Sequence, residues 1–291
     1  MSDGRAGDGG GKEFQRVSDV LHARLSDGTY PMGHRLPSQR ELAQELHVSR
    51  DTIQRVFAEL VNEEWIESRQ GSGSRVVRAQ EVRSSPPQDR GEPITLGPLI
   101  SAAFESPRVS LDVFTLTSES LDTHIRLQAE RVRAGVISPD QINVRMLLPS
   151  EAIPHPYPRA KNDSDDTRPQ ERLKEITRRH TYSLRTLLRD LQVERLVPAT
   201  RLEIRRVPLT PANKLYLLNG TEALFGPYEV LERPILLDSG EEIEALDVLG
   251  LGSPLAHFVK DDDPRSQRSV FVTSMQAWFD SCWNLLAEDC V

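Results

Sequence analysis

The residues best equipped for chemistry in this sequence stand close together, between positions 49 and 55. Arg50 and Arg55 carry guanidinium groups, which can donate paired hydrogen bonds to guanine or hold a phosphate. Gln54 carries an amide that can pair with adenine. Such groups recognise a nucleic acid when a helix presents them to a groove. The side chains that we expect to be exposed there are Ser49, Arg50, Asp51, Thr52, Gln54 and Arg55.

The pattern of apolar residues predicts the helix that would present them. Ser49 is a suitable N-cap for this helix. A shorter helix is expected before it, because Ser38 and Glu41 form a capping box and the helical pattern runs to Glu45. The residues "LHV" (46–48) make the turn between the two helices. The second helix would bury the side chains that recur at i, i+3, i+4 and i+7, namely Ile53, Val56, Phe57 and Leu60.

A β-hairpin is predicted directly after these helices. The segment "WIESRQGSGSRVV" (65–77) has the pattern of a strand, a glycine turn and a second strand. Gly71 and Gly73 would let the tip of the hairpin approach a DNA backbone closely, and Arg69 and Arg75 would add positive charge on either side. These elements together predict a winged helix-turn-helix. A first helix is expected before them, on the helical spacing of Phe14, Val17, Val20, Leu21 and Leu25.

The motif "YPMGHRLPSQRELAQELHVSRDTIQRVFAELVNEEWIESRQGSGSRVV" (30–77) lies within residues 13–78, which closely resemble the GntR family of bacterial transcription regulators. The resemblance implies a DNA-binding domain, placed at 13–80, and a homodimer on a pseudo-palindromic operator in double-stranded DNA. The half-sites would lie about one DNA turn (roughly 34 Å) or a multiple of it apart. By position, the contacts typical of the family fall on Arg40, Ser49, Arg50, Thr52 and Gly71. With the residues argued above, the predicted DNA-binding set is Arg40, Ser49, Arg50, Thr52, Gln54, Arg55, Arg69, Gly71, Gly73 and Arg75.

The charge is divided unevenly along the chain. The net charge is −8, yet residues 12–80 carry ten positive and ten negative side chains, so the acidity belongs to the remainder. This division suits a small DNA-binding module attached to an acidic sensor. No apolar run is long enough for a membrane span, and residues 1–12 have the composition of a disordered leader rather than a secretory signal. We therefore expect a cytoplasmic, nucleoid-associated protein with reduced cysteines and no cofactor.

The rest of the sequence predicts a second, α/β domain. Residues 81–98 are rich in Pro, Ser, Gly and charge and are expected to be a linker, so the second domain would span 99–291. Strand, helix and strand patterns follow one another within residues 108–149, which favours a parallel βαβ unit. Residues 149–170 are expected to be a long mobile loop. The predicted fold class is multidomain α+β, with a winged helix-turn-helix followed by an α/β effector or dimerisation domain with a mixed sheet.

One stretch of the second domain has a spacing that suggests phosphate chemistry. In "PANKLYLLNGTEALFG" (211–226), Lys214, Asn219 and Gly226 stand at the spacing of the phospholipase D signature, so the domain weakly resembles a degenerate member of that fold. Ala212 stands where the nucleophilic histidine would be, which implies that catalysis is absent. Lys214 and Asn219 remain candidate ligand contacts. The alternative interpretation is that Lys214 only opens an exposed strand.

Weaker candidates are better explained by structure than by function. The charge run "KDDDP" (260–264) could bind a cation but is typical of a solvated loop, and Phe279 and Trp283 have the spacing of a buried helix face. Three hypotheses for the second domain stay open: it senses a small molecule, it only dimerises or recruits a protein, or it is a phosphodiesterase-like enzyme with a DNA-binding appendage. The absent nucleophile favours a protein that is not an enzyme.

Overall fold

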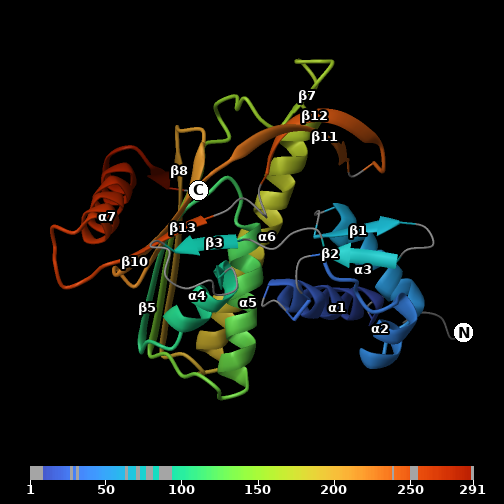
Figure 1. The fold of residues 1–291 in the computed structure, drawn as a ribbon, viewed down its shortest axis with the longest axis horizontal. Coiled ribbons are helices and arrows are strands. Elements are labelled where there is room, and N and C mark those ends of the chain that lie inside the picture. Colours follow the sequence, from blue (N-terminus) through green and yellow to red (C-terminus); the bar gives the residue numbers. More distant parts are fainter. Residues whose placement is uncertain are drawn as a thin grey trace, which may run out of the picture. The chain divides into compact units, whose positions relative to one another are not determined.

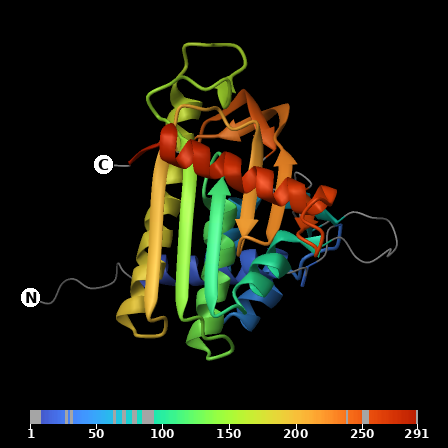
Figure 2. The same cartoon turned by 90° about the vertical axis from the view of Figure 1, so that its left-hand side faces the viewer.

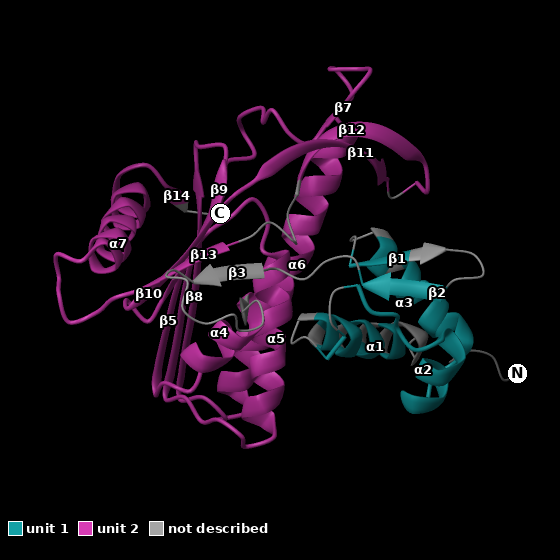
Figure 3. Cartoon of the chain, in the orientation of Figure 1, with its two compact units in different colours: residues 1–79 teal, residues 80–291 magenta. Residues whose placement is uncertain are grey.

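The computed structural model describes residues 9–26, 29–30, 33–62, 65–69, 73–76, 81–84, 94–237, 239–249 and 255–289 (Figure 1). The chain divides into two compact units, residues 1–79 and residues 80–291 (Figure 3). Within the described residues, no helix combines the length and the apolar character needed to cross a membrane.

The first unit is a helical domain with a small β-hairpin. Its apolar side chains, among them Leu21, Leu42, Ile53 and Leu60, are completely buried and form one core between the helices. The first helix begins at Gly9, so the prediction of a disordered leader through residue 12 was wrong at its end. Adding a residue to the end of an existing helix costs little free energy, because each added residue gains a hydrogen bond. The elements are α1 (Gly9–Ser26), α2 (Gln39–Glu45), α3 (Arg50–Asn62), β1 (Ile66–Arg69) and β2 (Gly73–Val76).

The second unit is built on a nine-stranded mixed sheet with the strand order β14-β8-β6-β5-β9-β10-β13-β3-β4. Strands β5, β6 and β8 are parallel, whereas β9, β10 and β13 continue the sheet in antiparallel pairs. The strands are β3 (Glu81–Ser84), β4 (Ile94–Thr95), β5 (Arg108–Phe114), β6 (Gln141–Pro149), β8 (Ala199–Val207), β9 (Asn213–Leu218), β10 (Glu222–Pro227), β13 (Leu255–Val259) and β14 (Glu288–Asp289).

Helices cover both faces of this sheet (Figure 2). One face is covered by α4 (Leu96–Ala103), α5 (Glu119–Arg133) and α6 (Arg168–Val193), and the other by α7 (Gln267–Leu285). The central strand β6 therefore buries side chains on both sides, with Met146 in the core under α5 and α6 and Leu147 in the core under α7. The observed fold class is the predicted one, a winged helix-turn-helix followed by an α/β region with a mixed sheet.

Two segments that were predicted to be irregular contain strands. Within the expected linker at 81–98, β3 pairs with β13 and with β4, and α4 begins at Leu96. Within the expected mobile loop at 149–170, β7 (Arg159–Ala160) joins a separate three-stranded sheet with β11 (Glu229–Leu236) and β12 (Glu242–Leu249). Composition did not predict these short strands, because a sheet can take in a polar segment through backbone hydrogen bonds alone. Outside β7, residues 150–158 and 161–166 form neither helix nor strand.

Candidate nucleic-acid interface

The start of α2 is fixed by reciprocal hydrogen bonds between Ser38 and Glu41. The Ser38 backbone N–H donates to Glu41 Oε2 at 2.7 Å, and the Glu41 N–H donates to Ser38 Oγ at 3.3 Å. The first of these bonds, followed by the side-chain contact, lowers the pKa of Glu41. The predicted capping box is therefore present, and it sets the position of Arg40 in the first turn of α2.

The turn between α2 and α3 is tight. His47 adopts a left-handed backbone with a φ of 53°, and the Val48 N–H donates to the Ala43 carbonyl at 3.0 Å. Ser49 then begins α3, since its Oγ accepts the Thr52 N–H at 3.1 Å. This geometry is the helix-turn-helix that the sequence predicts.

Thr52 is a correction to the predicted exposed set. Its side chain is only 6% exposed, and its hydroxyl is hydrogen-bonded to Ser49 Oγ at 2.9 Å. Position 52 lies one residue before the buried Ile53 and four before the buried Val56, so it falls on the inner face of the helix. Thr52 therefore positions the start of α3 and does not face outward.

The outer face of α3 carries the polar groups in question. Arg50, Asp51 and Gln54 are exposed, and Arg50 and Gln54 lie one helical turn apart on the same side. Arg55 is also exposed, but its guanidinium carbon lies 4.8 Å from the centroid of the Phe14 ring in α1. A cation–π contact of this kind holds Arg55 toward α1. Arg50 and Gln54 are thus the side chains best placed for a groove.

The hairpin of β1 and β2 has the predicted register, with Arg69 opposite Gly73. Gly73 has a φ of +77°, a conformation that disfavours any side chain, so glycine is required here. Arg75 is exposed on β2. Gly71 and the side chain of Arg69 lie outside the described residues, and their predicted contacts stay predictions.

Residues 33–36 add a third strand segment to this hairpin, which the sequence did not reveal. The Leu36 N–H donates to the Ser74 carbonyl at 2.9 Å, the Val76 N–H donates to the His34 carbonyl at 3.0 Å, and Arg35 pairs with Arg75 in an antiparallel bridge. Arg35 and Arg75 are both exposed, so two positive charges stand directly opposite each other. Like charges in such a pair repel each other, and Glu67, which stands opposite Arg75 on β1, brings one negative charge to the same row.

The arginines of this unit fall into two groups. Arg16 donates to the Leu46 carbonyl at 2.7 Å, and Arg24 is paired with Glu45 at 2.6 Å, a contact that raises the pKa of Arg24. Among the described residues, a second group of exposed arginines makes no hydrogen bond, ion pair or ring contact. This group comprises Arg35, Arg40, Arg50 and Arg75. Unpaired guanidinium groups on one small domain are available to bind phosphates.

The second unit holds Lys214 within β9 and Asn219 directly after it. Lys214 is 2% exposed, and its Nζ lies 5.4 Å from the ring centroid of Tyr228. Asn219 Oδ1 accepts the Ser110 N–H at 2.8 Å, and its Nδ2 donates to the Ala103 carbonyl at 3.0 Å. Lys214 is thus buried within the sheet, which contradicts the alternative of an exposed strand, and Asn219 lies in the turn after β9, where its amide binds the backbone. Their predicted ligand contacts stay predictions.

The remaining candidates have structural roles. Phe279 and Trp283 are buried in the core under α7, as their spacing indicated. In the "KDDDP" segment, Asp261 Oδ1 accepts the hydroxyl of Ser269 and also the Asp263 N–H. The described residues hold no group of three His, Cys, Asp or Glu side chains that could bind a metal ion.

Known proteins match the first unit. Residues 14–76 match the family model "Bacterial regulatory proteins, gntR family". The Uxu operon regulator of Haemophilus influenzae is 33% identical over 70 residues, which are 24% of this chain and 26% of that protein. The Exu regulon transcriptional regulator of Escherichia coli K12 is 36% identical over 67 residues, 23% of this chain and 26% of that protein. The matches thus span about a quarter of the length of these curated relatives.

Solved structures match the same region. A GntR family transcriptional regulator from Listeria monocytogenes is 32% identical and covers 26% of this chain and 62% of that chain, with a TM-score of 0.22. The AraR(DBD) structure in complex with operator ORX1 is 25% identical and covers 26% of this chain and 93% of that chain, with a TM-score of 0.23. The match to the family model identifies residues 14–76 as a winged helix-turn-helix domain of the GntR family, which confirms the resemblance seen in residues 13–78.

Proposed function

We propose that this chain is a transcription regulator that binds operator DNA through residues 14–76. The observation that carries the proposal is the group of exposed, unpaired arginines on the helix-turn-helix and the hairpin, Arg35, Arg40, Arg50 and Arg75. In an acidic chain, unpaired positive charge on the one domain that matches bacterial regulators supports a phosphate-binding face.

The helix α3 would enter the major groove. Arg50 and Gln54 are one turn apart on its exposed face and would reach base edges, guanine for the guanidinium and adenine for the amide. Arg40 would hold a phosphate, and Ser49 would sit close to the backbone at the start of the helix. Thr52 acts through Ser49, whose position it fixes.

The hairpin would contact the DNA backbone beside the groove. Arg35 and Arg75 would share a phosphate, which relieves the repulsion between them. Gly73 allows a close approach, and Arg69, Gly71 and Arg55 complete the proposed set with smaller contributions. This arrangement adds Arg35 to the contacts proposed from the sequence.

The second unit would set the geometry of a homodimer on a pseudo-palindromic operator in the cytoplasm, at the nucleoid. A small molecule bound there would change operator affinity only through its different affinity for two dimer geometries. A dimer that binds DNA in this way requires two half-sites in the operator, spaced by about one helical turn or a multiple of it.

The test is an affinity measurement on a selected operator. Duplexes are first selected from a random pool with the full chain, and binding is then measured by fluorescence anisotropy. Arg40→Ala combined with Arg50→Ala should weaken binding by at least about tenfold, since each contact is worth roughly 1–3 kcal/mol. Arg201→Ala, an exposed arginine of the second unit, is the matched control and should bind normally. Unchanged affinity in the double variant would contradict the proposal.

A further inference from the structure

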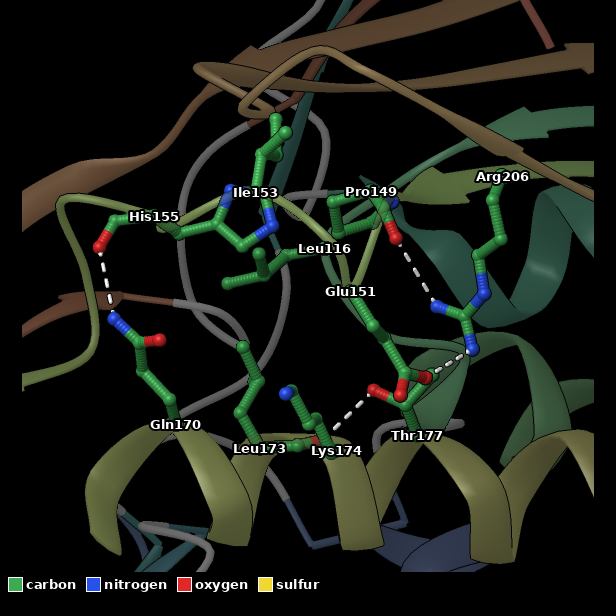
Figure 4. A pocket seen from close by; sticks show the side chains of 10 residues that line it. All are labelled: Leu116, Pro149, Glu151, Ile153, His155, Gln170, Leu173, Lys174, Thr177 and Arg206. Atoms are coloured by element: carbon green, nitrogen blue, oxygen red, sulfur yellow. Dashed lines mark hydrogen bonds and ion pairs between the residues drawn. The ribbon is translucent and has the colours of Figure 1, made fainter. Parts of the chain in front are cut away.

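A cavity lies in the second unit where three parallel strands end. Leu116 follows β5, Pro149 is the last residue of β6, and Arg206 is the last but one of β8. The first turns of α6 close the opposite side of the cavity (Figure 4). Its unfilled space is about 370 Å³ when the open solvent at its mouth is counted, and the part enclosed by protein is much smaller. In open α/β sheets, ligands bind outside the carboxyl ends of the strands, which is the place of this cavity.

One part of the wall is apolar. Leu116 is 5% exposed and packs in a buried cluster with Tyr157 and Tyr228, against which Leu173 of α6 also packs. The hydroxyl of Tyr228 accepts the Leu116 N–H at 2.9 Å, so the floor of the cavity is held in place. Ile153 lies on the far side. An apolar group of a few carbon atoms would be sheltered from water here.

Another part of the wall is charged and already organised. Arg206 donates from Nη1 to the Pro149 carbonyl at 3.2 Å and from Nη2 to Glu151 Oε1 at 2.7 Å. The other oxygen of Glu151 accepts a hydrogen bond from Arg178 at 3.2 Å. One carboxylate is thus shared by two guanidinium groups, so both of these cations are engaged by a negative charge of the protein itself.

Lys174 is a further cation at this cavity, and it does not take part in the contacts of Glu151. It lines the cavity and is half-buried, yet it makes no hydrogen bond or ion pair among the residues that the structure describes. Figure 4 shows its side chain on the cavity side of α6, between Leu173 and Glu151. The Nζ of Lys174 is not among the described buried polar atoms that lack a hydrogen-bond partner, so it keeps contact with water, and an anion in the cavity would give it a charge-assisted hydrogen bond.

The neighbouring His155 does not compete for an anion. Its Nε2 lies 2.8 Å from the Ser150 carbonyl, which can only accept, so Nε2 carries a proton and donates. Its Nδ1 lies 3.1 Å from Thr210 Oγ1 and can accept from that hydroxyl. Both ring nitrogens are therefore used by the protein itself, and the ring forms a fixed part of the wall.

We propose that this cavity binds a small organic monocarboxylate, with its carboxylate on Lys174 and its short apolar body against Leu116 and Leu173. A phosphate dianion fits less well, because the cavity offers one unpartnered cation beside the carboxylate of Glu151. A role as the effector of the regulator rests on the proposed function, whereas the binding itself does not.

The bound carboxylate would connect α6 to the ends of the parallel strands. A ligand that binds the folded protein and not the unfolded chain raises the free energy of unfolding of the protein. Any change that the ligand makes in operator affinity must be matched by the same factor in its own affinity when operator is present.

The experiment uses the full chain and defined probes. Butanoate, hexanoate and benzoate are each compared with their amides, with inorganic phosphate as a separate arm, by thermal shift and then by isothermal titration. We expect at least one carboxylate to bind and its amide not to bind. Lys174→Gln should weaken that binding by about tenfold or more, because a hydrogen-bonded ion pair is lost. Glu151→Gln should strengthen it, because a competing negative charge is removed, and Lys260→Gln is the matched control.

The outcomes separate the two proposals. The inference is overturned if no carboxylate in the panel binds, if phosphate binds in their place, or if Lys174→Gln binds a carboxylate as well as the unchanged protein does. Operator affinity without ligand is measured in parallel and should be the same in all three variants. If neither the unchanged protein nor any variant binds operator while carboxylate binding persists, the proposed function is refuted and the cavity assignment stands.

Discussion

Replacing Arg35 with alanine tests whether this residue contributes to the stability of the fold or to DNA binding. Arg35 stands directly opposite Arg75 in an antiparallel bridge, where side chains begin about 5 Å apart. Because both are long and exposed, their charges can separate to roughly 7 Å, which in water corresponds to a repulsion of about 0.6 kcal/mol. Salt at physiological strength reduces this to about 0.3 kcal/mol.

Arg35→Ala is therefore expected to leave the free protein as stable as before or more stable by about 0.3 kcal/mol. The same change should weaken operator binding, and the slope of log affinity against log salt should fall by about 1, because one phosphate contact is lost. Urea denaturation measures the first effect and fluorescence anisotropy at several salt concentrations measures the second. Arg35→Lys keeps the charge and is the matched control. A less stable variant with an unchanged operator affinity and salt slope would refute the reasoning.

Two further predictions concern stability. Ser38→Ala should lower the free energy of unfolding by about 1 kcal/mol, because α2 loses its N-cap. Ser106→Ala, which lies outside a helix start, is the control. An unchanged denaturation midpoint in Ser38→Ala would contradict the capping role. Burial lowers the pKa of His180, but its hydrogen bond to Asp122 and the charges of Glu119 and Asp122 outweigh this and raise the pKa above 6.5. The pair thus adds stability that is fully present below pH 6.5 and is lost as the pH rises through the raised pKa. The denaturation midpoint of the unchanged protein should therefore fall as the pH rises through this range, and the midpoint of His180→Gln should change less.

The sequence predicted the helix-turn-helix well because its determinants are local. The capping box at Ser38 and Glu41 and the apolar face of α3 each act within one or two turns of helix. Thr52 was misplaced because it was grouped with the polar residues at the start of α3, although the helical period puts it inward. Arg35 was missed because its bridge to Arg75 joins residues that no local pattern connects.

The second unit was predicted less well, because its structure depends on contacts between distant residues. Strand β3 was taken for part of a linker, yet its partner β13 comes far later in the chain. The alternative that Lys214 opens an exposed strand was wrong, because the strand that carries it is central in the sheet and its side chain is buried. The cavity around Lys174 has no sequence signature, since it is formed by three strand ends and one helix.

The pairing of β3 with β13 also bears on the order in which the chain folds during synthesis. The register joins Val82 to Leu255, so this edge of the sheet cannot form until Leu255 has left the ribosome. The first unit depends on contacts within residues 1–79 and can fold as soon as those residues emerge. We expect a nascent chain to complete its helix-turn-helix long before the cavity beside Lys174 exists.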